Sequence, residues 1–138
     1  MTRIFFATLV ALVFGISDAA VCSEEQNKPK TAPPSGKAIY QKNCSVCHSL
    51  KPPPKMAPPI VGMAAHYRDA FTDKDAAITH MVQFMQAPDS SKSKLEPQAI
   101  ARFGLMPVIP LSEKELRTVS EWLWNQYDPS FALPKRCN

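Results

Sequence analysis

The string Cys44-Ser-Val-Cys47-His48 constrains this chain more than any other feature of its sequence. Two cysteines at this spacing, at the end of a helix, reach two vinyl groups on one edge of a porphyrin and bond to them covalently. The residue that follows is carried under the metal, where an imidazole nitrogen binds it. The string therefore predicts one covalent c-type haem, with Cys44 and Cys47 as its attachment points and His48 as a ligand of the iron.

Two other uses of a Cys-x-x-Cys pair fit the sequence less well. A thioredoxin-like redox pair lies between a strand and a helix, and no segment shows the sustained two-residue alternation of a strand. A zinc site needs a second pair of ligands. For that pair only His66, His80 and the distant Cys22 and Cys137 remain.

The first twenty residues have the layout of a secretory signal peptide. A positive start at Arg3 leads into the apolar run Ile4–Ile16, and small residues follow at 17–20. Such a run is shorter than the roughly 20 residues that span a bilayer. We therefore assign residues 1–20 to a signal peptide and expect the mature chain in the periplasm, where disulfides persist. An uncleaved anchor and lipid attachment at Cys22 are the alternatives.

Hydrophobic periodicity and capping residues predict an all-α fold of short helices. Ser35 can cap a first helix. Thr72 begins another, with Asp75 as its capping partner. Ser112 and Glu115 have the spacing of a capping box for the last helix. The expected helices run from Gly36 to the Cys44 region, over Gly62–Tyr67, from Thr72 to Pro88, over Gln98–Phe103, and from Ser112 through an apolar stripe of Leu116, Val119, Leu123 and Tyr127.

The segments outside these helices are long and rich in proline. Residues 21–35 are polar and without periodicity, which indicates a flexible leader. Lys51–Pro59 holds five prolines, which exclude helix and central strand and predict an ordered, extended loop. Residues 89–94 are a polar loop. A chain with so few and such short helices needs a staple or an added core.

Composition excludes several classes of function. The chain of 138 residues is 45% apolar, which is typical of one globular domain. It has only 4 glycines, which leaves little room for tight hairpins or phosphate-cradling loops. Its net charge of +4 is too mild for a nucleic-acid binder.

The second face of the iron has several candidate ligands. Met56 lies only eight residues after His48 and is too close to reach the other face. Met81 and Met85 lie on the apolar face of their helix, where core packing explains them. His80 lies roughly opposite that face, so we expect it to be solvated. The full set is Met56, Met63, Met81, Met85, Met106, His66 and His80.

Met106 differs from the other candidates because its loop is stiff. Gly104 suits a left-handed position that ends a helix. Pro107 fixes the backbone after Met106, and Pro110 stiffens the exit from the loop. A thioether on such a loop can be aimed at the iron without helix packing. We predict Met106 as the ligand, with His66 or an open position as the alternatives.

The chain resembles a class I, single-haem bacterial cytochrome c from about Gly36 to Tyr127. The haem-binding string and the loop Phe103-Gly104-Leu105-Met106-Pro107 together carry the resemblance. Gly36-x-x-x-Tyr40-x-x-x-Cys44 is similar to the first helix of the family, and Leu116, Val119, Trp122 and Leu123 are similar to the face of its last helix. The resemblance implies the cytochrome c fold, with short helices and long loops wrapped around one haem.

The family resemblance also assigns a role to Pro58. Ala57-Pro58-Pro59-Ile60-Val61-Gly62 is similar to the loop in which a proline carbonyl accepts a hydrogen bond from the haem-ligating histidine. Pro58 is the matching position, and its oxygen would set the orientation and basicity of His48. The chain departs from the family pattern in the insertion Pro52-Pro53-Pro54, which precedes this loop.

Ligation by a histidine and a methionine leaves no vacant position on the iron, which favours one-electron transfer over oxygen activation. We therefore expect no enzyme activity but a soluble periplasmic electron carrier of a respiratory chain. The alternative is a haem c electron-transfer subunit of a periplasmic dehydrogenase or oxidase complex. A haem sensor or peroxidase would need a vacant or labile position.

The expected partners are redox proteins, with no nucleic acid and no stable membrane insertion after signal cleavage. Lysines flank the attachment string and form either a basic rim that steers an acidic partner or an ordinary solvated surface. They are Lys37, Lys42, Lys51 and Lys55. We expect the cytochrome c domain at residues 36–131 and a tail at 132–138. Since the first and last helices of the family pack together, the resemblance also allows a disulfide between Cys22 and Cys137.

Overall fold

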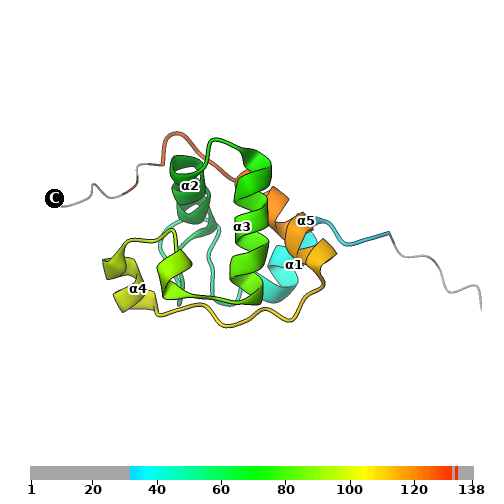
Figure 1. Cartoon of the computed structure of the whole chain (residues 1–138), viewed down its shortest axis with the longest axis horizontal. Helices are drawn as coiled ribbons and strands as arrows, with labels where there is room; N and C mark the ends of the chain where they lie inside the picture. The colour runs from blue at the N-terminus through cyan, green and yellow to red at the C-terminus, as the bar shows by residue number, and fades with distance from the viewer. Residues whose placement is uncertain (1–31, 132, 134–138) are drawn as a thin grey trace, which may run out of the picture. The chain divides into compact units, whose positions relative to one another are not determined.

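The computed structural model describes residues 32–131 and 133, and within them it contains helices and no strand. The α-helices are labelled in Figure 1, and a π-helical turn and a 3₁₀ turn complete the described elements. The elements are α1 (Gly36–Ile39), the π turn η1 (Tyr40–Cys44), α2 (Ile60–Ala70), α3 (Lys74–Gln86), the 3₁₀ turn η2 (Ser90–Lys92), α4 (Pro97–Phe103) and α5 (Glu113–Trp124). The prediction of an all-α fold is confirmed.

Several predictions fall outside the described residues. They concern the signal peptide at 1–20, most of the leader at 21–35 and the tail at 132–138 apart from Leu133. Cys22 and Cys137 also lie outside the described residues. These assignments therefore stay predictions.

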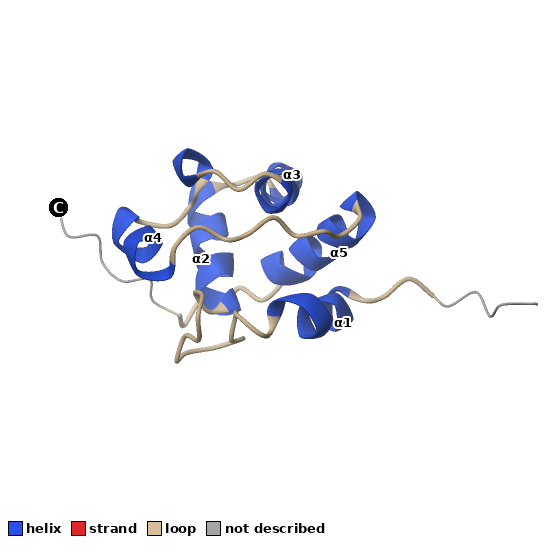
Figure 2. Ribbon diagram, turned by 90° about the horizontal axis from the view of Figure 1, so that it is seen from below, coloured by secondary structure: helices blue, strands red, loops and turns tan. Residues whose placement is uncertain are grey.

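Helix α5 is a common packing partner of several other helices. Helices α1, α2 and α3 all contact it, and both views place α1 directly beside it (Figures 1 and 2). Its first turn closes as the predicted capping box, because the hydroxyl of Ser112 accepts from the N–H of Glu115 at 3.3 Å and the carboxylate of Glu115 accepts from the N–H of Ser112 at 3.0 Å. These bonds satisfy N–H groups that a helix start leaves open.

The crossing of α1 and α5 depends on the absence of a side chain at Gly36. A Cβ atom there would lie 2.3 Å from the Cβ of Trp122 and 2.6 Å from the carbonyl oxygen of Thr118. The close approach lets the ring of Tyr40 stack on Trp122, with ring centroids 4.7 Å apart. Behind this contact lies the first core cluster, formed by Ile39, Tyr40, Ile60 and Val119.

A second core cluster lies where α2, α3 and α5 meet. Tyr127 was predicted for the core stripe of the last helix, and that prediction is wrong. Because α5 ends at Trp124, Tyr127 has left the helical period, and its side chain is 42% exposed. Trp124, which is 4% exposed, takes the core position instead. The second core cluster consists of Tyr67, Ala77, Met81 and Trp124.

Helix α2 is longer than the sequence predicts. It runs over Ile60–Ala70 rather than Gly62–Tyr67. Its first two N–H groups donate to the carbonyls of Ser49 and Leu50, at 2.9 and 3.1 Å. The preceding loop therefore satisfies groups that the helix cannot satisfy itself, and this allows the earlier start.

The capping residue of helix α3 lies one residue later than predicted. Thr72 with Asp75 was expected to cap it, but the carboxylate of Asp73 accepts the N–H of Ala76 at 2.7 Å. Aspartate competes well for this position because its oxygen reaches the free N–H groups of the first turn. The helix consequently starts at Lys74.

Helix α4 has the predicted proline in its first turn and the predicted glycine after its end. It includes Pro97 itself and runs to Phe103. Gly104 has the expected positive φ of 74°, but its ψ of −178° is extended rather than left-handed helical. Glycine is the residue that adopts this combination without strain, so the chain leaves α4 directly into an extended loop.

The contact at Gly36 yields a stability prediction. Gly36→Ala forces a methyl group against Trp122 and the backbone of α5, and we expect it to lower the free energy of unfolding by about 1–3 kcal/mol. Gly62→Ala is the matched control, because a Cβ there meets only ring atoms of Phe131 at 3.5 Å. Since alanine favours a helix over glycine, the control should retain or gain stability in denaturant unfolding. Equal losses in the two variants would contradict the prediction.

Candidate functional site

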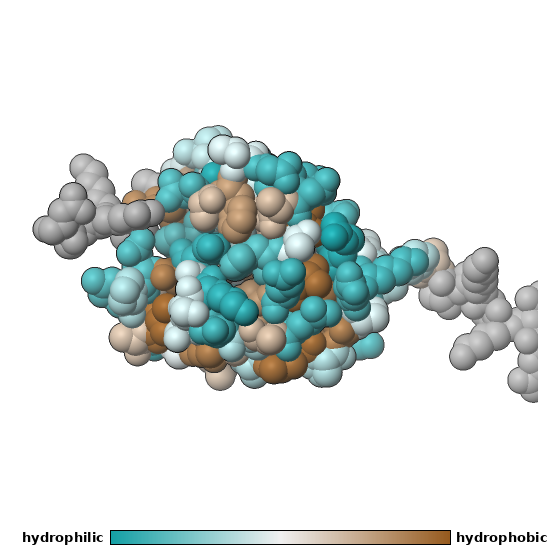
Figure 3. All heavy atoms as spheres, viewed as in Figure 1, coloured by the Kyte–Doolittle hydropathy of each residue, from teal (hydrophilic) through white to brown (hydrophobic). Residues whose placement is uncertain are grey.

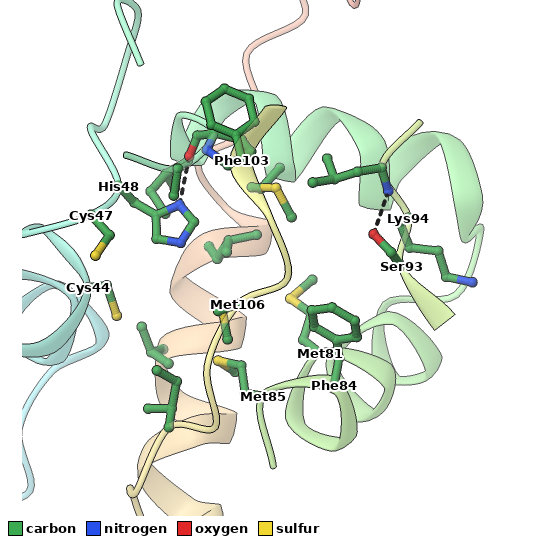
Figure 4. A pocket seen from close by; sticks show the side chains of 18 of the residues that line it. Cys44, Cys47, His48, Met81, Phe84, Met85, Ser93, Lys94, Phe103 and Met106 are labelled. Atoms are coloured by element: carbon green, nitrogen blue, oxygen red, sulfur yellow. Dashed lines mark hydrogen bonds between the residues drawn. The ribbon is translucent and has the colours of Figure 1, made fainter. Parts of the chain in front are cut away.

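The attachment string follows directly from the π-helical turn. The carbonyl of Cys44 accepts from the N–H groups of both Cys47 and His48, at 3.1 and 2.9 Å. This tight turn places the two sulfur atoms along the same wall, with the imidazole of His48 beside them (Figure 4). Single π-helical turns are frequent at functional sites. The structure thus brings together the three residues of the predicted string.

The Cys44 thiol lacks the electrostatics of a reactive redox cysteine. Burial raises the pKa of the Cys44 thiol, and the neighbouring Cys47 raises it further. Redox-active Cys-x-x-Cys pairs have a lowered pKa instead. Over residues 32–131 and 133, no three histidine, cysteine, aspartate or glutamate side chains are grouped as a metal site would need.

The imidazole of His48 is oriented by Pro58. Its Nδ1 lies 2.7 Å from the carbonyl oxygen of Pro58. Because a carbonyl only accepts, Nδ1 carries the proton and Nε2 carries the free lone pair. Burial lowers the pKa of His48, although the Pro58 bond opposes this shift. The neutral imidazole that results is the form that binds metals.

The loop after His48 folds back so that Pro58 can reach the ring. The N–H of Ala57 donates to the carbonyl of Cys47 at 3.1 Å. The hydroxyl of Tyr40 donates to the carbonyl of His48 at 2.9 Å and holds the backbone from the other side. The predicted contact between His48 and Pro58 is therefore present despite the insertion Pro52-Pro53-Pro54.

A cavity of about 370 Å³ opens beside this string. Its volume lies within the ~300–1,000 Å³ of small-molecule and cofactor sites, and its walls are almost entirely apolar. Cys44, Cys47 and His48 line one side, and five methionines contribute thioethers to the rest, which are Met56, Met63, Met81, Met85 and Met106. Two adjacent thiols, a free imidazole nitrogen and soft thioethers around an apolar space are a donor set that fits a covalent haem.

Among the candidate second ligands, the structure separates the histidines from the methionines. Neither His66 nor His80 lines the cavity. Met56 is 71% exposed, whereas Met81 is 3% exposed within the second core cluster. Met106 lies on the loop after α4, half-buried, and its side chain faces the same space as His48 (Figure 4).

The prediction that His80 is solvated is wrong. Its ring is half-buried, and its Nδ1 lies 3.2 Å from the hydroxyl of Tyr67. The rings of Phe71 and Phe84 lie 5.3 and 6.4 Å away, centroid to centroid. The helical period of α3 placed His80 opposite the apolar face, but α2 and the turn after it cover that side as well.

Several cavity residues were not singled out from the sequence. Ser93 and Lys94 belong to the segment predicted as a polar loop, yet both line the cavity. Ser120 is 1% exposed, and its hydroxyl donates to the carbonyl of Leu116 at 2.8 Å. Ser120 lies four residues after Leu116 and therefore on the same face of α5, and this spacing in the sequence could have indicated that it is buried.

Two of the four lysines of the predicted rim have partners in the structure. Lys51 lies 3.7 Å from the carboxylate of Asp128. The ammonium of Lys55 donates to the carbonyl of Ser45 at 2.6 Å. Both lysines are exposed beside the attachment turn. Interactions at the surface stabilise a fold only slightly.

Comparison with known proteins places the string and the methionine loop within one family match. Residues 31–123 match the family described as "Cytochrome C oxidase, cbb3-type, subunit III". The chain is also 28% identical over 115 residues to a protein of Aquifex aeolicus (strain VF5) named "Uncharacterized protein", covering 70% of this chain and 76% of that protein. No solved structure matches the chain. Of the helices described, none has both the length and the apolar character needed to cross a membrane.

The buried hydroxyl of Tyr67 yields a prediction for alkaline pH. Burial raises the pKa of Tyr67 above its ordinary value, so the folded chain keeps it neutral while the unfolded chain ionises it above about pH 10. The resulting stabilisation is present below that pH and is lost as pH rises further. In denaturant unfolding between about pH 8 and 12, Tyr67→Phe should lose less stability with rising pH than the wild type. Tyr127→Phe, on an exposed side chain, should follow the wild type, and parallel curves for both variants would contradict the assignment.

Proposed function

Since this chain belongs to the c-type cytochrome family of cbb3 oxidase subunit III, we propose that it is a soluble periplasmic electron carrier. The family binds a covalent c-type haem with iron, and its members carry electrons. Beyond this, we propose that Cys44 and Cys47 hold the haem through thioether bonds and that His48 binds the iron.

The observation that carries the proposal is the hydrogen bond between Nδ1 of His48 and the Pro58 carbonyl. It holds the imidazole in the tautomer whose Nε2 is free and faces the cavity. A ligating histidine usually donates its other N–H in this way, which raises the basicity of the coordinating nitrogen. Pro58 therefore acts on the cofactor through His48, as an orienting group.

Met106 supplies the second ligand in this proposal. When bound, the haem exchanges single electrons at its iron. A thioether favours the ferrous form, and the apolar walls of the cavity exclude water from the same space, so we expect a fairly high potential. With both positions filled, His48 and Met106 would be the ligands in both oxidation states.

The second candidate function is an electron-transfer subunit of a periplasmic dehydrogenase or oxidase complex. The name of the family describes an oxidase subunit. Apolar side chains also gather on the surface near the cavity, since Met56, Leu105 and Val108 are 71%, 45% and 60% exposed. Figure 3 shows apolar residues along the lower edge, where the loop after α4 runs in Figure 1. Purification of a stable second chain with the native protein would favour the subunit over the free carrier.

The proposed location and disulfide concern residues at the two ends of the chain. We propose that residues 1–20 direct export to the periplasm and that Cys22 pairs with Cys137 in the mature protein. Titration of the unfolded, unreduced protein should then find no free thiol, because Cys44 and Cys47 are bound to haem. Two free thiols per chain would contradict the disulfide.

Absorption spectroscopy of the purified holoprotein tests the ligand set. We expect one thioether-linked haem per chain in a pyridine haemochrome assay, a red methionine–iron charge-transfer band in the ferric state, and no binding of carbon monoxide in the ferrous state. Met106→Ala should abolish the band, admit carbon monoxide and lower the midpoint potential. Met56→Ala is the control, since that side chain is 71% exposed. A red band that survives in Met106→Ala would exclude Met106 as the ligand.

A further inference from the structure

We propose that Met106 is positioned by a hydrogen bond from the backbone N–H of Ile109 to the carbonyl of Met85, at the end of α3. The two atoms lie 3.0 Å apart. The proposal rests on the role of Met106 as a ligand, and it adds the reason why the thioether stays in place.

The loop around Met106 has few other ties. Within the described part of the chain, the N–H groups of Leu105, Met106 and Val108 make no hydrogen bond to the backbone. The side chains of Leu105 and Val108 are 45% and 60% exposed, so packing does not hold them. A segment with open backbone groups and exposed side chains opens at low cost in free energy.

The two ends of this loop are fixed in different ways. At the first end, the N–H of Gly104 donates to the carbonyl of Ile100 at 2.8 Å, and the positive φ of Gly104 turns the chain out of α4. At the other end, Ile109 bonds to Met85, and Leu111 packs against the first core cluster. The free span therefore contains only residues 105–108, with Met106 inside it.

The Met85 carbonyl is available because of how α3 ends. It is one of the last four carbonyls of the helix, which have no partner within it. A tightened last turn would give it the N–H three residues later, but that residue is Pro88, which has none. The N–H of Ile109 fills the position instead.

Met85 is a firm support for this bond. Its side chain packs against both the first and the second core clusters. Figure 4 shows it next to Met106 on the same side of the cavity. The core thus fixes the Met85 carbonyl. The hydrogen bond from Ile109 to this carbonyl in turn restrains the Met106 thioether, three residues earlier. Ile109 is a positioning residue, acting through its backbone.

Hydrogen exchange of the ferrous holoprotein gives the first test. We expect the amide of Ile109 to exchange roughly tenfold or more slowly than the amide of Val108, after correction for intrinsic rates. Similar corrected rates at the two positions would overturn the proposal. This measurement needs no variant, so it stands even where a substitution prevents folding.

Proline substitution gives the second test. Ile109→Pro removes the N–H, and we expect a weaker red charge-transfer band and a roughly tenfold larger carbon monoxide-accessible fraction. Val108→Pro is the matched control, because it adds a proline one position earlier where no hydrogen bond is lost. Ile109→Ala shortens the side chain but keeps the N–H, so it should weaken the band less than Ile109→Pro. Equal effects of Ile109→Pro and Val108→Pro would overturn the proposal.

Met106→Ala separates failure of this proposal from failure of the ligand assignment. If that variant loses the band while Ile109→Pro retains it, Met106 is the ligand and the Met85–Ile109 bond does not position it. If Met106→Ala keeps the band, both the ligand assignment and the positioning role are overturned.

Discussion

The hydrogen bond from His48 to the Pro58 carbonyl is the constraint on which the candidate site depends. It requires the chain to return to the attachment turn within ten residues, and three further backbone bonds make this return possible. Two of those bonds also supply partners for the first N–H groups of α2, so the start of this helix and the orientation of the His48 imidazole depend on the same segment. A change at this junction would therefore alter local folding and cofactor chemistry at once.

The helical core is divided around the cavity rather than gathered in one place. One cluster lies at the crossing of α1 and α5, and the other lies where α2, α3 and α5 meet. The apolar cavity borders residues of both, including Tyr40 and Tyr67. In a small domain with short helices, a haem in this space adds the apolar contacts that the side chains alone do not provide. This accounts for the modest number of core residues.

Local sequence patterns predicted the features that depend on neighbouring residues in the chain. They did not predict the features that depend on tertiary contacts. The attachment string and the Ser112 capping box follow from short-range chemistry, and the structure contains both. Gly104 ends α4 with the expected positive φ, although its ψ is extended rather than left-handed helical. Periodicity gave the wrong surroundings for His80, because the neighbouring α2 covers a side of α3 that period alone assigns to solvent. No local pattern predicts a bond between Met85 and Ile109, since it joins a helix end to a distant loop.

The proline-rich segment after His48 contributes both to the protein surface and to the orientation of the His48 imidazole. Its base is closed by the bond between Ala57 and Cys47 and by the contact of Pro58 with the imidazole. Residues 51–53 and 55–56 project beyond that closure and are exposed. We therefore expect changes in these exposed residues to leave the hydrogen bond between His48 and Pro58 in place. The exposed rim of the cavity and the orientation of the imidazole therefore depend on different residues of one short segment, so that the surface beside the site can change in shape and charge while the His48–Pro58 contact stays the same.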